Sequence, residues 1–136
     1  MSGFAEYDNF DGLGLGELVR NGDISAADLL DEAIDRTERV NGELNAVIDK
    51  LYEEARGAIT SGLPKGPFCG VPFLLKDLHL LMEGAVTSNG SAMWRGAVAD
   101  HDSTLVTRYR QAGVVVFGKT NSPELGLNPV TEPREY

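Results

Sequence analysis

Two short apolar runs, each preceded by a helical pattern, constrain the fold of this chain more than any other feature of its sequence. Val71–Leu75 (VPFLL) and Val114–Phe117 (VVVF) are continuous apolar stretches of strand length. Such runs are typical of strands that are covered on both faces. Pro72 is tolerated because it stands near the beginning of its strand. Helix followed by buried strand, twice over, predicts an α/β fold with a largely parallel sheet.

Apolar residues at helical spacing predict the helices that flank this sheet. Ser25 and Asp28 have the spacing of a capping box, with Asp28 in place of the usual Glu, so we expect a helix to begin there. Asn41-Gly42 is expected to end that helix, whose charged side is an ordinary solvated face. The predicted helices lie at about residues 13–20, 26–40, 50–61 and 104–112.

Three further segments give weaker local signals. Ser122–Glu124 has an N-cap residue, a proline at the first helical position and an acid in the first turn, which predicts another helix. Residues 91–96 are expected to form a helical turn that packs Met93 and Trp94. Residues 1–11 carry no periodic pattern and are expected to be an arm.

Lys76 and Asp77 follow the first apolar run directly. Because successive side chains of an extended segment point to opposite faces, the two need not pair, and one of them can face a pocket alone. Ligand sites of open α/β sheets lie beyond the carboxyl ends of strands. Desolvation, here expected from the apolar run, lowers the pKa of a lysine, and the neutral amine is a base. Lys76 is therefore a candidate base, although spacing alone favours a lysine that extends along apolar neighbours to the surface.

A second motif, Gly113–Thr120 (GVVVFGKT), matches the phosphate-binding pattern G-x-x-x-x-G-K-[ST] letter for letter. That site needs a strand before its first glycine and a helix that opens at the Gly-Lys-Thr. Here a predicted helix precedes Gly113, and the four intervening residues are strand formers. Pro123 falls where the helix would need its N–H donors. We therefore disfavour nucleotide binding.

Charge and composition disfavour several classes of function. The 136 residues, enough for one domain, carry 12 basic and 21 acidic side chains and a net charge of −9, which argues against nucleic acid or anionic membrane as a partner. No apolar run is long enough to span a bilayer. The single Cys69 excludes an intramolecular disulfide and fits a reducing compartment, so we expect a cytoplasmic location. A catalytic thiol is disfavoured because neither histidine has a recognisable setting.

The order of these motifs resembles the amidase signature family of serine hydrolases. Gly70–Asp77 (GVPFLLKD), followed by a loop of small and hydroxyl residues, is similar to the family's lysine segment. Asp102–Gly113 (DSTLVTRYRQAG) and Gly118–Asn121 (GKTN) are similar to the helix and strand end that follow it. Ser122–Pro133 (SPELGLNPVTEP) resembles the segment that approaches the substrate pocket. The resemblance extends from about Leu13 to Pro133.

This resemblance implies both a fold and a chemistry. Residues 1–136 would form a single partial domain, the N-terminal part of an amidase-signature fold with a mixed, largely parallel sheet flanked by helices. Lys76 would be the proton acceptor of a Ser–cis-Ser–Lys triad that hydrolyses a carboxamide through an acyl-enzyme. Gly126, Leu127 and Asn128 would lie in the substrate pocket. The implied partner is a small-molecule amide, and neither a metal nor an organic cofactor is implied.

The serines of that triad have no counterpart in the sequence. The family's glycine-serine stretch, G-G-S-S-G-G, is absent up to Tyr136, and Ser88 and Ser91 stand too close behind Lys76 without that glycine pattern. We expect a chain that carries the base without the nucleophile and is inactive alone. The alternative is an inactive truncated relative or a binding module kept for its fold. Uncovered sheet edges are expected to promote self-association.

Overall fold

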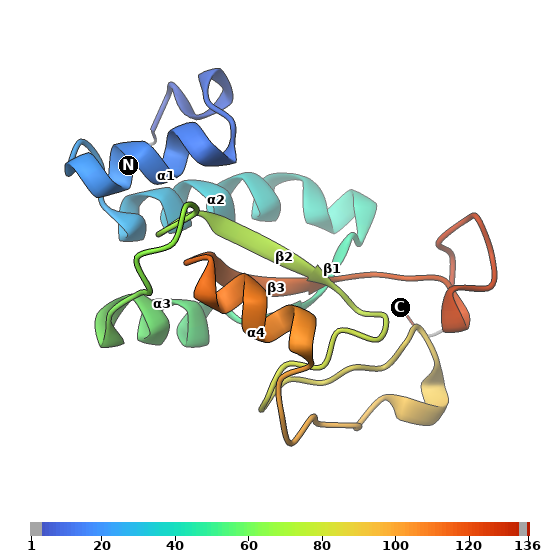
Figure 1. Ribbon diagram of the computed structural model, residues 1–136. Coiled ribbons are helices and arrows are strands. Elements are labelled where there is room, and N and C mark those ends of the chain that lie inside the picture. The colour runs from blue at the N-terminus through green and yellow to red at the C-terminus, as the bar shows by residue number, and fades with distance from the viewer. Residues whose placement is uncertain (1–3, 134–135) are drawn as a thin grey trace.

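The second apolar run, Val114–Phe117, lies largely in the middle strand of a three-stranded sheet. In the computed structural model, which describes residues 4–133 and 136, β3 (Val115–Thr120) pairs in parallel with β2 (Pro72–Lys76) and antiparallel with β1 (Val47–Lys50). The strand order is β1-β3-β2 (Figure 1). Every residue of β3 before Thr120 is buried, as expected for a strand with apolar cover on both faces. The predicted α/β fold with a mixed sheet is confirmed.

One face of the sheet is covered by α2 (Ala26–Leu44) and α3 (Tyr52–Ser61). These helices pack against every second residue of β3, because successive side chains of a strand point to opposite faces of the sheet. The buried cluster on this face consists of Leu30, Ala33, Ala55, Val115 and Phe117.

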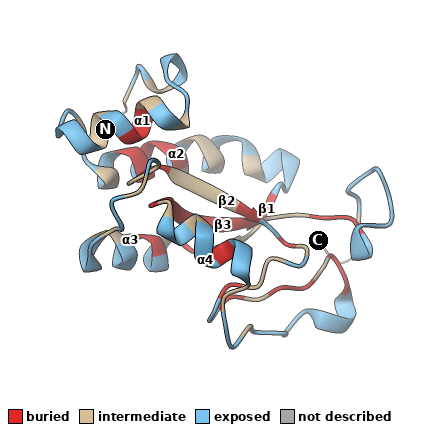
Figure 2. Cartoon of the chain, viewed as in Figure 1, coloured by how far each residue is buried: buried red, intermediate tan, exposed pale blue. Residues whose placement is uncertain are grey.

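The other face is covered by α4 (Thr104–Gln111) and by the loop that follows β2. Its buried cluster consists of Leu51, Leu75, Met82, Ala85, Val106, Val114 and Val116. A third cluster, with Leu15 and Leu29, joins α1 (Gly12–Asn21) to α2. Figure 2 shows buried residues along β3, near the end of β2 and on the helices.

The start of α2 predicted from Ser25 and Asp28 is confirmed, with Ser25 as the N-cap residue. The Ser25 hydroxyl oxygen accepts a hydrogen bond from the Asp28 N–H at 3.0 Å, and the hydroxyl donates to the Asp28 carboxylate at 2.6 Å. This arrangement satisfies one of the N–H groups that the first turn of a helix leaves without an intrahelical acceptor.

The predicted end of α2 at Asn41-Gly42 is wrong, because the helix continues to Leu44. The Asn41 side chain bonds the backbone N–H and C=O of Val47, at 2.8 and 2.9 Å, and so ties the helix to the start of β1. The left-handed residue that ends the helix is Asn45, with φ 46°. Asn adopts this conformation more readily than most residues.

Two predicted local structures need correction. The turn η2 (Ala92–Trp94) forms, but it does not pack its side chains in a core, since Met93 is 81% exposed and Trp94 38%. The helix predicted from Ser122–Glu124 is only a single turn, η3 (Glu124–Gly126). The left-handed conformation of Leu125, with φ 54°, prevents the helix from continuing.

The N-terminal segment predicted as an arm contains one short turn, η1 (Tyr7–Asn9). Residues 1–3 lie outside the described residues. Phe4 and Tyr7 pack against the cluster that joins α1 to α2, and the Asp8 carboxylate forms an ion pair with Arg36 at 2.5 Å. Across the described residues, no helix has both the length and the apolarity needed to cross a membrane.

The Gly113–Thr120 match is a turn and a strand rather than a phosphate-binding loop, since Gly118 and Lys119 lie within β3. We therefore predict that ATP leaves the thermal unfolding midpoint of the chain unchanged, because only a ligand that binds the folded state raises it. Thermal melts with and without ATP and magnesium measure this. A midpoint that rises with ATP concentration would contradict the prediction.

With the order β1-β3-β2, each outer strand has one edge that pairs with no other strand among the described residues. Such edges are templates for pairing with a second chain. We predict that the purified chain self-associates, so that its average mass by light scattering or sedimentation rises with concentration. A mass that stays monomeric up to high concentration would be the opposite result.

Candidate active site

Lys76 is the last residue of β2 and is exposed between two buried neighbours. Leu75 is 0% exposed and Asp77 2%. Within the described residues, the Lys76 ammonium makes no hydrogen bond or ion pair, so the expectation that it need not pair with Asp77 is confirmed. Lys76 itself is exposed, because the buried side chains of the run, Val71 and Leu75, turn into the clusters; its expected desolvation by the run stays a prediction.

Asp77, directly after the candidate base, uses all of its polar groups. Its N–H donates to the carbonyl oxygen of Thr120 at 2.9 Å, and its carbonyl oxygen accepts from the Ser122 hydroxyl at 2.9 Å. Its carboxylate accepts from the Ser88 N–H at 2.9 Å and from the Ser88 hydroxyl at 2.5 Å. The same carboxylate lies 3.2 Å from the ammonium of Lys119. The backbone at the end of β2 is therefore held from several sides.

Lys119, which the sequence analysis did not select, is the buried cation of this site. It is 0% exposed, and its ammonium donates to the carbonyl oxygen of Val86 at 2.6 Å and to the Thr87 hydroxyl at 2.5 Å. Burial lowers the pKa of Lys119, and the Asp77 carboxylate opposes that shift. A lysine inside a strand of buried residues was the signal that could have identified it, since unpaired lysines are rarely buried.

Ser88 and Ser91, which the sequence analysis set aside as nucleophiles, are both buried. The Ser88 hydroxyl donates to Asp77, and the Ser91 hydroxyl donates to Glu124 at 2.7 Å. Each hydroxyl proton is thus committed to a carboxylate, and both serines hold loops together.

A small cavity of about 160 Å³ lies beside the ion pair, with Asp49, Asp77, Ser88 and Arg95 among its lining residues. Burial raises the pKa of Asp49, and the Lys119 ammonium opposes that shift. Among the described residues, no three His, Cys, Asp or Glu side chains lie close enough together to hold a metal ion.

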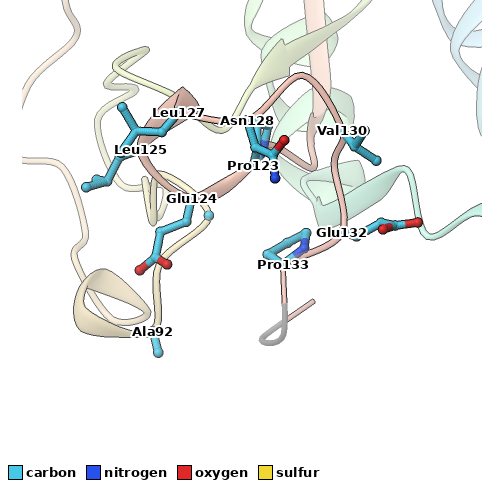
Figure 3. Close-up of a pocket in the computed structure, with 10 residues that line it drawn as sticks. Ala92, Pro123, Glu124, Leu125, Leu127, Asn128, Val130, Glu132 and Pro133 are labelled. Atoms are coloured by element: carbon cyan, nitrogen blue, oxygen red, sulfur yellow. The ribbon is translucent and has the colours of Figure 1, made fainter.

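An open groove of about 740 Å³ lies between the 90–92 segment and the loop after β3 (Figure 3). Leu127 and Asn128, two of the predicted substrate-pocket residues, line this groove, whereas Gly126 and Lys76 are not among its lining residues. Gly126 lies against Leu78 instead. A Cβ on Gly126 would come within 2.8 Å of the Leu78 side chain, and its φ of 70° also favours glycine.

The wall of the groove is tied to the loop after β2. The Leu125 N–H donates to the carbonyl oxygen of Asn89 at 2.8 Å, and the Asn89 side chain accepts from the His79 N–H at 2.9 Å. These three residues all have positive φ angles, between 53° and 60°. Left-handed conformations outside glycine are uncommon, and here three of them follow one another in a series of hydrogen bonds that joins the loop after β2 to the groove.

The chain is similar in sequence and in structure to known proteins. A family model described as Amidase matches residues 28–136. The chain belongs to the amidase signature family. A 6-aminohexanoate-cyclic-dimer hydrolase of Paenarthrobacter ureafaciens is 48% identical over 122 residues, which are 88% of this chain and 24% of that protein. A lipoamidase of Enterococcus faecalis is 37% identical over 134 residues, or 97% of this chain and 18% of that protein.

Solved structures of the amidase signature family share the fold. A 6-aminohexanoate cyclic dimer hydrolase matches with a TM-score of 0.85 and 42% identity, over 92% of this chain and 26% of that one. The chain thus spans about a quarter of the length of the first relatives it matches. The predicted family membership is confirmed, and the roles of Lys76, Gly126, Leu127 and Asn128 stay predictions.

We predict that Lys119→Met lowers the free energy of unfolding by about 3–5 kcal/mol, because it leaves the Asp77 carboxylate buried without its cation. The double variant with Asp77→Asn removes both charges and should recover much of that loss. Urea denaturation of the unchanged chain, the single variant and the double variant measures both effects. Lys65→Met, at an exposed lysine, is the matched control. A Lys119→Met chain as stable as the control would show that the ion pair is unimportant.

Proposed function

We propose that this chain is the lysine-bearing part of an amide hydrolase and that Lys76 is its proton acceptor. The observation that carries the proposal is Lys76 at the carboxyl end of β2, within a segment that resembles the lysine segment of the family to which the chain belongs. Carboxyl ends of strands are where α/β folds bind ligands.

In the proposed mechanism, the neutral amine of Lys76 takes a proton from a bridging serine, which takes one from the nucleophilic serine. The nucleophile's oxygen attacks the carboxamide carbon, the C–N bond breaks, the nitrogen leaves with a proton, and an acyl-enzyme remains. Water then releases the acid. Backbone N–H groups stabilise the oxyanion both when the acyl-enzyme forms and when water cleaves it. The two serines and these donors are proposed to lie outside this chain.

The contrast between two lysines supports Lys76 as the base. Lys119 has three polar partners and is fully buried, so its ammonium is occupied in holding the structure. Lys76 is exposed at the strand end and can meet a serine from another segment. A base must be neutral to accept a proton, so the proposal requires that segments outside the described residues cover Lys76 and desolvate it.

The groove at Leu127 and Asn128 supports an amide with an aliphatic chain as substrate. Exposed Leu127 and Val130 give it apolar walls. The Asn128 side chain can both donate to and accept from a carboxamide. The name of the Paenarthrobacter relative describes an amide of an aliphatic amino acid, and we propose a substrate of that class for this protein.

The test is a fusion of the full chain to the remaining part of the Paenarthrobacter relative, assayed on the 6-aminohexanoate cyclic dimer. We expect turnover, and a loss of about 100- to 10,000-fold in kcat for Lys76→Met, the range that general bases contribute. Lys76→Arg should be as inactive, because a guanidinium does not give up its proton. Lys65→Met should retain activity, and the unfused chain should have none.

Three results would contradict this proposal. Near-normal turnover by Lys76→Arg would exclude Lys76 as proton acceptor. Turnover by the unfused chain that is lost in Lys76→Ala would show that the nucleophile lies within the 136 residues. A folded fusion without activity would favour a binding module kept for its fold.

A further inference from the structure

Two lysines lie close to one another at the carboxyl ends of β2 and β3. In the register of these strands, Lys119 is opposite Leu75, and Lys76 is opposite Thr120. Lys119 is fully buried, and its three polar partners are all protein groups. It is therefore not placed to touch a substrate, and any effect of Lys119 on the reaction must pass through another residue.

Asp77 is the connection between Lys119 and the candidate base. It follows Lys76 in the chain, and Thr120 and Ser122 fix its N–H and its carbonyl oxygen. Its buried carboxylate pairs with the Lys119 ammonium, which supplies the opposite charge. Because Asp77 is held through both its backbone and its side chain, it also fixes the direction in which the Lys76 side chain leaves the strand.

The same ammonium closes the loop that follows β2. The carbonyl oxygen of Val86 and the hydroxyl of Thr87 accept from Lys119, and the next residue, Ser88, donates to Asp77. Residues 77–88 thus form a closed loop around one buried cation. Without that cation the Asp77 carboxylate would remain buried and unpaired, a state that proteins avoid by moving the group towards water.

We propose that Lys119 is a positioning residue for Lys76: its buried ammonium, paired with Asp77, fixes the end of β2 from which the base projects. The inference rests on the proposed function of Lys76. It predicts an effect on the chemical step, because a misplacement of reacting groups by about 1 Å can lower a rate on the order of 100-fold. Substrate binding in the groove, which Lys119 does not line, should change little.

The experiment measures kcat and KM of the fusion with Lys119→Met. We expect kcat to fall by about 100-fold with KM nearly unchanged, and the added substitution Asp77→Asn to restore part of kcat. Val106→Ala is the matched control, because Val106 is likewise 0% exposed but its apolar side chain takes no part in the hydrogen bonds and ion pair of this network. It should lower stability and leave kcat unchanged wherever circular dichroism shows a folded protein.

Ser88→Ala, which removes one donor to Asp77 without changing a charge, is a milder second variant. It should lower kcat by a smaller factor, again with KM unchanged. An unchanged kcat in folded Lys119→Met, or an equal loss in Val106→Ala, would overturn the inference. If Lys119→Met does not fold, an unchanged kcat in Ser88→Ala overturns it. If Lys76→Met stays active, the proposed function fails; if Lys76→Met is inactive and Lys119→Met is not impaired, only this inference fails.

Discussion

The ion pair between Lys119 and Asp77 is the interaction on which the carboxyl ends of β2 and β3 depend. A charged pair inside a protein loses its hydration, so it is maintained only where further hydrogen bonds satisfy both ions. Ser88, Val86 and Thr87 supply those bonds, and all three come from the loop after β2. The result is one polar cluster that joins two strand ends and a loop, beside apolar clusters that hold the rest of the sheet.

The fold could be predicted from the sequence where one physical effect dominates. Val114–Phe117 is apolar throughout, and its environment is apolar on both faces, so its burial followed directly. The N-cap at Ser25 was equally local. The end of α2 was misplaced because its deciding contact, between Asn41 and Val47, is made by a side chain whose partner a helical pattern does not reveal.

The candidate site was only partly predictable for a related reason. Lys76 stands beside an apolar run and can be identified from the sequence. The role of Lys119 becomes apparent only when β3 pairs with β2 and brings Lys119 to Asp77. Met93 and Trp94 illustrate the reverse case, since an apolar pair predicts burial and these two residues remain exposed. Leu127 and Asn128 line the groove and Gly126 does not, and the part of all three in binding a substrate stays a prediction.

The strand order has a consequence for how the chain folds as it is synthesised. The middle strand, β3, is the last of the three in sequence, and β1 and β2 do not pair with each other. Among the described residues, no strand has a partner strand until residue 120 has left the ribosome, so the faces of α2 and α3 that pack on Val115 and Phe117 stay uncovered until then. Folding that depends on such distant pairing is slow and exposes apolar surface to other chains. The nascent segment that ends before β3 is therefore a stage at which this chain exposes apolar surface to other chains.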